Sequence, residues 1–261
     1  MTRRARPWLA RVIARTYSVV LVLLLWEAMS RTHLVSSQLA PSVESIAEQF
    51  WRFLLNGDLA FHTAITLKRA FFGFFAAVAC GVVFGTLIAR VRAVELFFEP
   101  IFSFGYPIPK IALYPIFVVL LGFSDASKIA LVFLECLYPI TIQTSHGMRS
   151  AERALVWAAQ NMGADARTLF WRVLVPSAAP AIFSGIRIAL PVALVVTIIT
   201  EIIGESRGLG FVVSFQSAAF NSAAAFAALF TLGIVGFAFD RTMILLRRRL
   251  IHWEKETPPL S

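Results

Sequence analysis

Charged residues are scarce in this chain, and their scarcity indicates its class. Of 261 residues, 15% are charged and 58% are hydrophobic, whereas a soluble domain carries about 25% charged residues. A core of this size cannot hide so much apolar surface, so lipid must cover part of it. The composition therefore predicts an all-α polytopic membrane protein.

The usual signatures of catalysis are also missing. The sequence contains no GxxxxGK[ST] phosphate loop, no HExxH motif and no GxSxG turn, and its four histidines are scattered. Cys80 and Cys136 both lie in apolar runs, which gives neither a disulfide framework nor a metal-binding spacing. No internal repeat is clear. We therefore expect no enzymatic activity, no metal and no cofactor.

Six apolar segments predict six membrane-spanning helices. The first begins near Trp8 and runs through 16–29; we interpret it as a span rather than a signal peptide, because Glu27 interrupts it and no small-residue cleavage site follows. The others cover 64–90, 95–122, 128–147, 178–204 and 223–246. We expect three regions: 1–63 with a cytosolic start, the first span and an outside loop that contains a surface helix; 64–249 as the transmembrane core; and 250–261 as a short cytosolic tail.

Several spans carry prolines and charges that lipid tolerates poorly. The third should be broken or kinked by its prolines, with Lys110 either lining a pore or snorkelling from a helix end. Glu135 is either a functional carboxylate or a structural partner of Lys110. Arg187 and Glu201 lie near span ends, where snorkelling would explain both. Gly81 and Gly85, four residues apart, favour a close helix contact. The pathway candidates are Lys110, Pro115, Glu135, Pro139 and Glu201.

The stretch 149–176 is too polar to lie in lipid and is patterned as two short amphipathic helices. The first has an apolar face at helical spacing: Leu155, Val156, Ala159 and Met162. Gly163 is a plausible C-cap, and Asp165 can cap the second helix. Pro176 ends that helix or begins the next one. Such a unit must pack against something outside the bilayer.

The distribution of positive charge predicts the orientation. Six spans place both termini and the stretch 149–176 on one side, with 16 of the 24 Lys and Arg residues; the other side holds six, and Lys110 and Arg187 lie within spans. Since Lys and Arg concentrate on the cytoplasmic side, both termini should be cytoplasmic. The net charge of +9 is then explained by the orientation of the chain in the membrane, and we expect no binding to nucleic acid.

The same stretch resembles the cytosolic signature loop of ABC importer permeases. That pattern is Glu-Ala-Ala, three residues, Gly, nine residues and Ile-x-Leu-Pro. Here it falls on 157–159, Gly163 and 173–176 with its spacing intact, although Trp157 replaces the Glu and two valines replace the Ile and Leu. The missing Glu removes any salt bridge that the family makes at that position.

Other segments look like the nitrate, sulfonate and taurine branch of that family: 107–115, 122–128, 146–150, and Glu201 followed by 208–210. The resemblance implies a pair of permeases, either a homodimer or two similar chains, in a bacterial inner membrane. ATP-binding cassette ATPase subunits would dock from the cytoplasm, and an extracytoplasmic solute-binding protein would deliver the substrate. A coupling helix at about 150–162 would contact the ATPase. The implied coupling residues are Ser150, Glu152, Arg153, Leu155, Val156, Ala158, Ala159, Met162, Gly163 and Pro176.

Other readings predict different behaviour. The stretch 149–176 could be an amphipathic loop that packs only on this chain's own helices. A self-sufficient secondary transporter or channel would work without ATP and would need Lys110, Glu135 and Arg187 to carry ions. A membrane-embedded enzyme would need a catalytic constellation that the sequence does not show. The substrate stays open among nitrate, sulfonates, taurine and small heterocycles.

Overall fold

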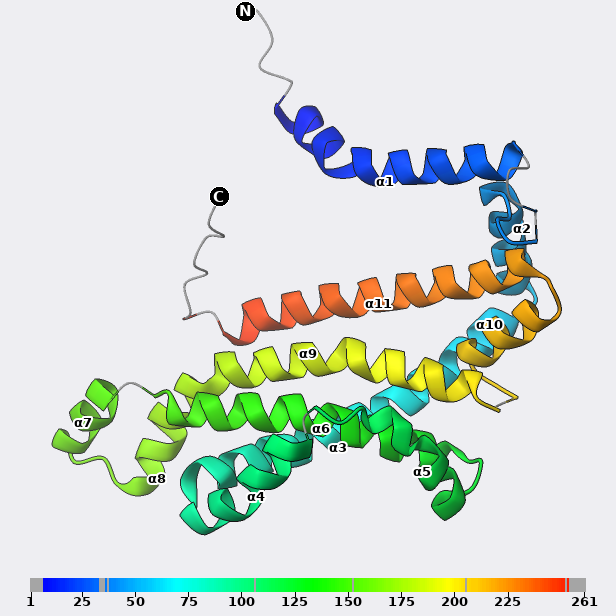
Figure 1. The fold of residues 1–261 in the computed structure, drawn as a ribbon. Helices are drawn as coiled ribbons and strands as arrows, with labels where there is room; N and C mark the ends of the chain where they lie inside the picture. Colours follow the sequence, from blue (N-terminus) through cyan, green and yellow to red (C-terminus); the bar gives the residue numbers. More distant parts are fainter. Residues whose placement is uncertain are drawn as a thin grey trace, which may run out of the picture. The chain divides into compact units, whose positions relative to one another are not determined.

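Every regular element in the described part of the chain is helical, which confirms the predicted all-α class (Figure 1). The computed structural model describes residues 7–32, 36, 38–105, 107–151, 153–204, 206–251 and 253. Most of the predicted tail 250–261 lies outside these residues. The elements are α1 (Pro7–Arg31), α2 (Val43–Leu55), α3 (Asp58–Arg90), α4 (Arg92–Gly105), the 3-10 turn η1 (Lys110–Leu113), α5 (Tyr114–Leu121), α6 (Asp125–Arg149), α7 (Arg153–Asn161), α8 (Ala166–Leu169), the π-helical turn η2 (Phe170–Leu174), α9 (Val175–Ile202), α10 (Leu209–Ala218) and α11 (Ser222–Leu250).

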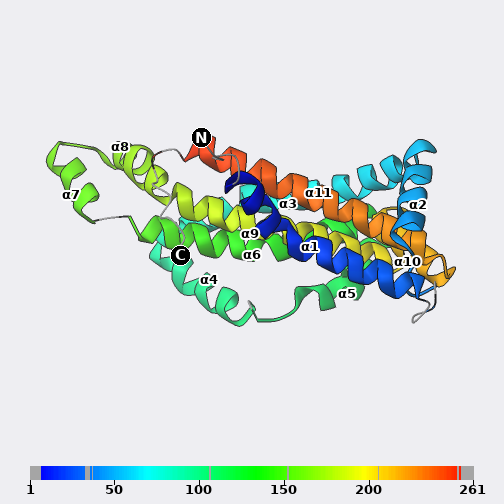
Figure 2. The ribbon, with the colours of Figure 1, turned by 90° about the horizontal axis from the view of Figure 1, so that it is seen from above.

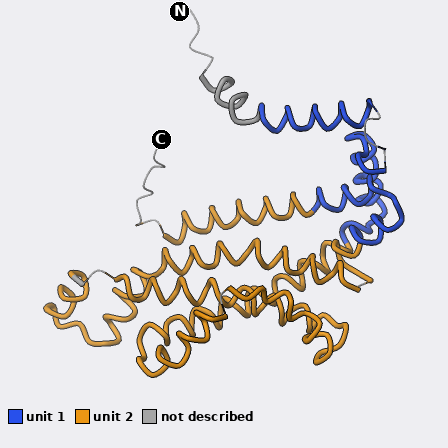
Figure 3. The backbone as a smooth tube through the Cα atoms, in the orientation of Figure 1, with its two compact units in different colours: residues 1–60, 212–231 blue, residues 61–211, 232–261 orange. Residues whose placement is uncertain are grey.

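The chain divides into two compact units (Figure 3). One unit contains the residues up to 60 together with 212–231; the other contains 61–211 and the chain from 232 onward. In the first, the Trp26 indole donates a hydrogen bond to the Pro41 carbonyl at 2.9 Å and packs edge-on against Phe226. Ser42 caps α2, the predicted surface helix, by accepting from the Ser45 amide. A hydrogen bond and an aromatic contact of Trp26 therefore connect α1 to the segment before α2 and to α11 within the first unit.

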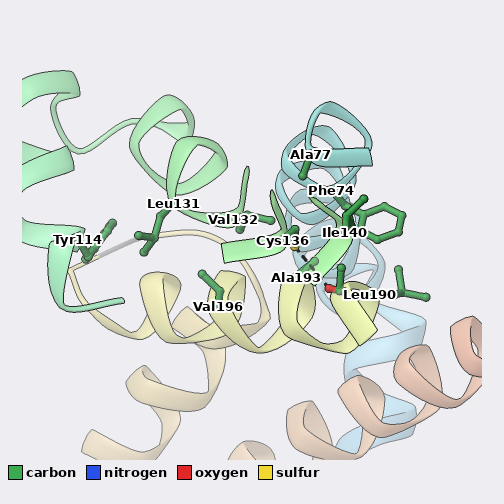
Figure 4. Packing of buried hydrophobic residues seen from close by; sticks show 11 residues of the cluster. Phe74, Ala77, Tyr114, Leu131, Val132, Cys136, Ile140, Leu190, Ala193 and Val196 are labelled. Atoms are coloured by element: carbon green, nitrogen blue, oxygen red, sulfur yellow. Dashed lines mark hydrogen bonds between the residues drawn. The ribbon is translucent and has the colours of Figure 1, made fainter. Parts of the chain in front are cut away.

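The second unit is built around α6 and α9, which lie side by side over much of their length (Figures 1 and 2). Their facing side chains form the core with residues of α3, as Figure 4 shows. Val132 and Cys136 of α6 are fully buried, as are Ala77 of α3 and Ala189 of α9. The Cys136 thiol donates to the Ala189 carbonyl at 3.4 Å, so this cysteine has a packing role.

Glycines let α3 and α9 approach α6 closely. A Cβ on Gly85 would lie 2.6 Å from both the Thr141 carbonyl oxygen and the Thr144 Cβ, and one on Gly81 would lie 2.8 Å from Ile140. On α9, a Cβ at Gly185 would lie 3.0 Å from the Pro139 carbonyl oxygen. The predicted close contact at Gly81 and Gly85 is therefore confirmed, and its partner is α6.

Three described helices are long and apolar enough to cross a membrane: α3, the continuous run Ala166–Ile202, and α11. A fourth candidate is the pair Arg92–Gly105 and Lys110–Leu121, whose parts lie at 93°. This pair is the predicted third span, and its break at the prolines is confirmed. The structure does not establish the predicted total of six spans.

Candidate functional site

The predicted coupling stretch forms a helical hairpin, α7–α8, that projects beyond the adjoining ends of α6 and α9 (Figures 1 and 2). Ser150 is the C-cap of α6: its amide donates to the His146 carbonyl at 2.9 Å. The first short helix therefore begins at Arg153, three residues later than the predicted start. Glu152 and the Arg153 side chain lie outside the described residues.

Local capping explains the turn between the two short helices. Gly163 has φ +81°, and its amide donates to the Gln160 carbonyl while the Ala164 amide donates to the Ala159 carbonyl. These two bonds form a Schellman motif, which favours glycine at the left-handed position. Asp165 then accepts from the Thr168 amide at 3.1 Å and caps α8. Both predicted caps are confirmed.

Pro176 lies in the first turn of α9 and follows a π-helical turn. The Val175 amide donates five residues back to the Phe170 carbonyl. Pro176 has no amide hydrogen and therefore cannot donate a backbone hydrogen bond to the preceding turn. The wider π-helical turn before it accommodates this missing hydrogen bond. Pro176 therefore begins the next helix, in a continuous run Ala166–Ile202.

The hairpin has an anchored side and an open side. Val156 and Phe170 pack against a small core of Met148, Leu174 and Ala178, and Ala159 is 8% exposed. By contrast, three large apolar side chains on α7 and its C-terminal turn are exposed: Leu155 by 50%, Trp157 by 62% and Met162 by 81%. A groove of about 550 Å³ runs beside them, lined by Leu155, Ala158, Met162, Pro176 and others. One side of the hairpin is therefore attached to α6 and α9, while the other side is exposed.

An ion-pair chain joins the hairpin end of α6 to α3 and α4. Arg149, the last residue of α6, contacts the Glu95 carboxylate at 3.0 Å and donates to the Ile88 carbonyl at 3.2 Å. Glu95 also accepts from Arg92 at 2.7 Å. These contacts connect the end of α6 that precedes α7 to α3 and α4.

A buried charged cluster lies at the opposite end of α9. We define the Glu201 cluster as Thr66, Arg69, Asp125, Glu201 and the backbone of 207–210. Glu201 is 0% exposed and Arg69 is 3% exposed, and they pair at 2.9 Å. Arg69 also pairs with Asp125 at 2.7 Å and donates to the Arg207 carbonyl. Snorkelling therefore does not describe Glu201.

The Glu201 carboxylate also fixes the start of α10. Its Oε2 accepts from the Thr66 hydroxyl at 2.8 Å and from the Gly210 amide at 3.0 Å, while the Thr66 oxygen accepts from the Leu209 amide. A Cβ on Gly208, which has φ +109°, would lie 2.2 Å from the Glu201 carboxyl carbon. The glycine is required because the backbone passes directly over the carboxylate.

The remaining pathway candidates are dispersed. Lys110 is 7% exposed and its ammonium lies 4.1 Å from the centre of the Tyr138 ring, so it is packed inside rather than extended to a surface. Pro115 is in the first turn of α5, and Glu135 is partly buried on α6. Arg187, for which snorkelling was the simple explanation, pairs with Asp240 of α11 at 3.1 Å.

A cavity of about 560 Å³, lined by both polar and apolar side chains, lies between α4, α6 and α9 and also contacts Ile88 of α3. We call it the α4–α6–α9 cavity. Pro139 is the one pathway candidate that lines it. Its other lining residues include side chains that the sequence did not single out as pathway residues: Glu99, Ser103, Gln143, His146 and Arg149. An acidic residue within a predicted span was the available signal for Glu99.

Apolar helices, a candidate span with a break and a hairpin with exposed apolar side chains are features of a helical membrane protein. A family model described as the binding-protein-dependent transport system inner membrane component matches residues 81–252. The chain belongs to this family.

The chain is similar to several permease proteins over almost their whole length. The chain is 31% identical to the formylaminopyrimidine transport permease protein ThiX of Halalkalibacterium halodurans, over 92% of this chain and 96% of that protein. It is 29% identical to the aliphatic sulfonates transport permease protein SsuC of Escherichia coli, over 97% and 96%. For the taurine transport system permease protein TauC of the same organism, the identity is 28%, over 95% and 92%.

The inward-facing MetNI methionine ABC transporter has the same fold. One of its chains matches with a TM-score of 0.60 at 20% identity, over 77% of this chain and 97% of that chain. The protein is thus the multi-pass permease subunit of an ATP-driven ABC importer and is not itself an enzyme. Membership in the family implies ATPase and solute-binding-protein partners. It therefore rules against the alternative hypothesis of a secondary transporter or channel that works alone.

Proposed function

We propose that the α7–α8 hairpin is the surface through which the ATPase drives this permease. The exposure of Leu155, Trp157 and Met162 on an otherwise anchored hairpin carries the proposal. A patch of exposed large apolar side chains outside the bilayer marks a protein–protein interaction site. The ATPase would press on these side chains, and the contacts of Arg149 with Glu95 and Ile88 would pass the displacement to α3 and α4.

We further propose that both termini and the hairpin face the cytoplasm of a bacterial inner membrane, and that two copies of this chain form the pathway. The predicted bias of 16 to six positive residues supports the orientation. The predicted six spans require α1 and α6 to cross as well. Each has 25 residues, or about 37 Å at 1.5 Å per residue, which exceeds a hydrocarbon core of about 30 Å.

For the substrate, we propose a small organic sulfonate, either an alkanesulfonate or taurine. SsuC and TauC, whose names give these substrates, match the chain over nearly its full length. The α4–α6–α9 cavity supports this class because Gln143, His146 and Arg149 offer hydrogen-bond donors to an oxyanion.

The first experiment is an affinity pull-down of the detergent-solubilised protein through a C-terminal tag. We expect a P-loop ATPase to be recovered with the wild type and lost with Trp157→Ser. Trp51→Ser is the matched control, because Trp51 on α2 is 59% exposed and lies in the other unit. Equal recovery of the ATPase with both variants would reject the hairpin as the docking surface.

Gly163 gives a second test. Its φ of +81° and the absence of any described atom within 4 Å of a Cβ make the cost of substitution conformational, about 1–2 kcal/mol for a side chain in this region. We expect Gly163→Val to insert normally but to lose substrate-stimulated ATP hydrolysis and uptake. Gly163→Asn, which tolerates the left-handed region, should retain both. Normal uptake by the valine variant would contradict the proposal.

A further inference from the structure

The α4–α6–α9 cavity has one carboxylate on its α4 side and several side chains that can donate hydrogen bonds on its α6 side. Glu99 and Ser103 are one turn apart on α4 and therefore share a face. Gln143, His146 and Arg149 recur every three residues on α6 and share the face opposite. The volume of about 560 Å³ is within the range of small-molecule sites, about 300–1,000 Å³.

Glu99 is the unusual member of this cavity. One turn earlier on the same helix, Glu95 contacts both Arg92 and Arg149. Glu99 has no hydrogen-bond or ion-pair partner among the described residues. Glu99 is exposed in the single chain and lies within the predicted third span. A carboxylate at such a position that has no protein partner and lines a cavity is a candidate for contact with a passing ligand.

The α6 wall can hold an oxyanion without trapping it. Arg149 is 41% exposed and shares its charge with Glu95 at 3.0 Å, which reduces the net positive charge that the cavity presents. Gln143 and His146 contribute further hydrogen-bonding groups. Transport requires binding that is strong enough for entry and weak enough for release, and a partly neutralised wall meets that condition.

We propose that the α4–α6–α9 cavity is a passage site for an amino sulfonate, with the ammonium group at Glu99 and the sulfonate toward Gln143, His146 and Arg149. The assignment rests on the proposed sulfonate substrate and makes it specific, because a simple alkanesulfonate has no group for Glu99 to bind. Glu99 is then a specificity-determining residue that contacts the ligand.

The test uses the complete importer, permease with its ATPase and binding protein, in proteoliposomes, with taurine and butanesulfonate as probes. We expect Glu99→Gln to lower taurine uptake about tenfold or more, as the loss of a hydrogen bond to a charged group predicts. Butanesulfonate uptake should not fall in this variant, because butanesulfonate has no ammonium group for Glu99 to bind, and Glu99→Asp should restore taurine uptake in part. Glu135→Gln is the matched control: Glu135 is a carboxylate within a predicted span that does not line this cavity.

The outcomes separate the two proposals. Wild-type uptake of butanesulfonate but not of taurine would overturn the passage site for an amino sulfonate and leave the sulfonate importer standing. An equal loss for both probes in Glu99→Gln, or no loss for either, would overturn the role of Glu99. Uptake of neither probe by the wild type would reject the sulfonate class itself, and the amino sulfonate site with it.

Discussion

Replacement of Glu201 by glutamine should destabilise the permease more than any change at an exposed carboxylate. The Glu201 oxygens accept from Arg69 at 2.9 Å, Thr66 at 2.8 Å and the Gly210 amide at 3.0 Å. An amide keeps one oxygen and replaces the other with a donor. In either orientation its NH2 group faces an existing donor, and the charge that balances Arg69 is lost.

The magnitude follows from this geometry. Removal of one member of a buried ion pair costs about 3–5 kcal/mol when the other is left without compensation. Arg69 still contacts Asp125 and the Arg207 carbonyl, so the lower end of that range, about 3 kcal/mol, applies here. The coupling between Glu201 and Arg69 should reach about 2–3 kcal/mol, because neighbours in one buried network are not additive.

The assay is unfolding of the purified protein in mild detergent, for the wild type, Glu201→Gln, Arg69→Met and the double variant. Glu48→Gln is the control, since Glu48 is 66% exposed and pairs with Arg52 one turn away on α2; exposed pairs of this kind contribute little. The reasoning would be refuted if Glu201→Gln were as stable as the control. It would also be refuted if the double variant lost a free energy of unfolding equal to the sum of the two single losses.

Two further predictions concern packing and capping. Gly85→Val should cost about 1–3 kcal/mol by overpacking, because a Cβ there would lie 2.6 Å from Thr141 and Thr144, whereas Gly233→Val on α11, with open space around it, should be neutral in the same unfolding assay. At Asp165, hydrogen bonds from the side chain and the amide of Thr168 lower the pKa of the carboxyl, so the α8 cap is present above the ordinary carboxyl pKa and is lost as pH falls through the lowered one. The protection of the amides of 165–169, relative to their intrinsic exchange rates, should therefore fall at acidic pH in the wild type but not in Asp165→Asn. An identical pH response of the protection factors in both proteins would contradict this.

Local chemistry let the sequence determine much of this protein. The surplus of apolar residues required a membrane, apolar segments indicated the long helices, and the 3.6-residue pattern indicated the two short helices of 149–176. Gly163 and Asp165 were predicted as caps because a helix end is satisfied by the residues next to it. The prolines of 107–115 predicted a broken span for an equally local reason: each removes a backbone donor. The family's motif likewise lies within a single stretch, 157–176.

Only the tertiary structure brought together groups that are distant in sequence. Arg69 and Glu201 are 132 positions apart, and the spacing of each residue along its own helix gave no sign of the other. Glu99 was not singled out until α4, α6 and α9 formed one cavity. The physical reason is that the identity of a buried charge's partner depends on which helices pack together, and that packing is determined by small residues such as Gly85 and Gly185 meeting α6.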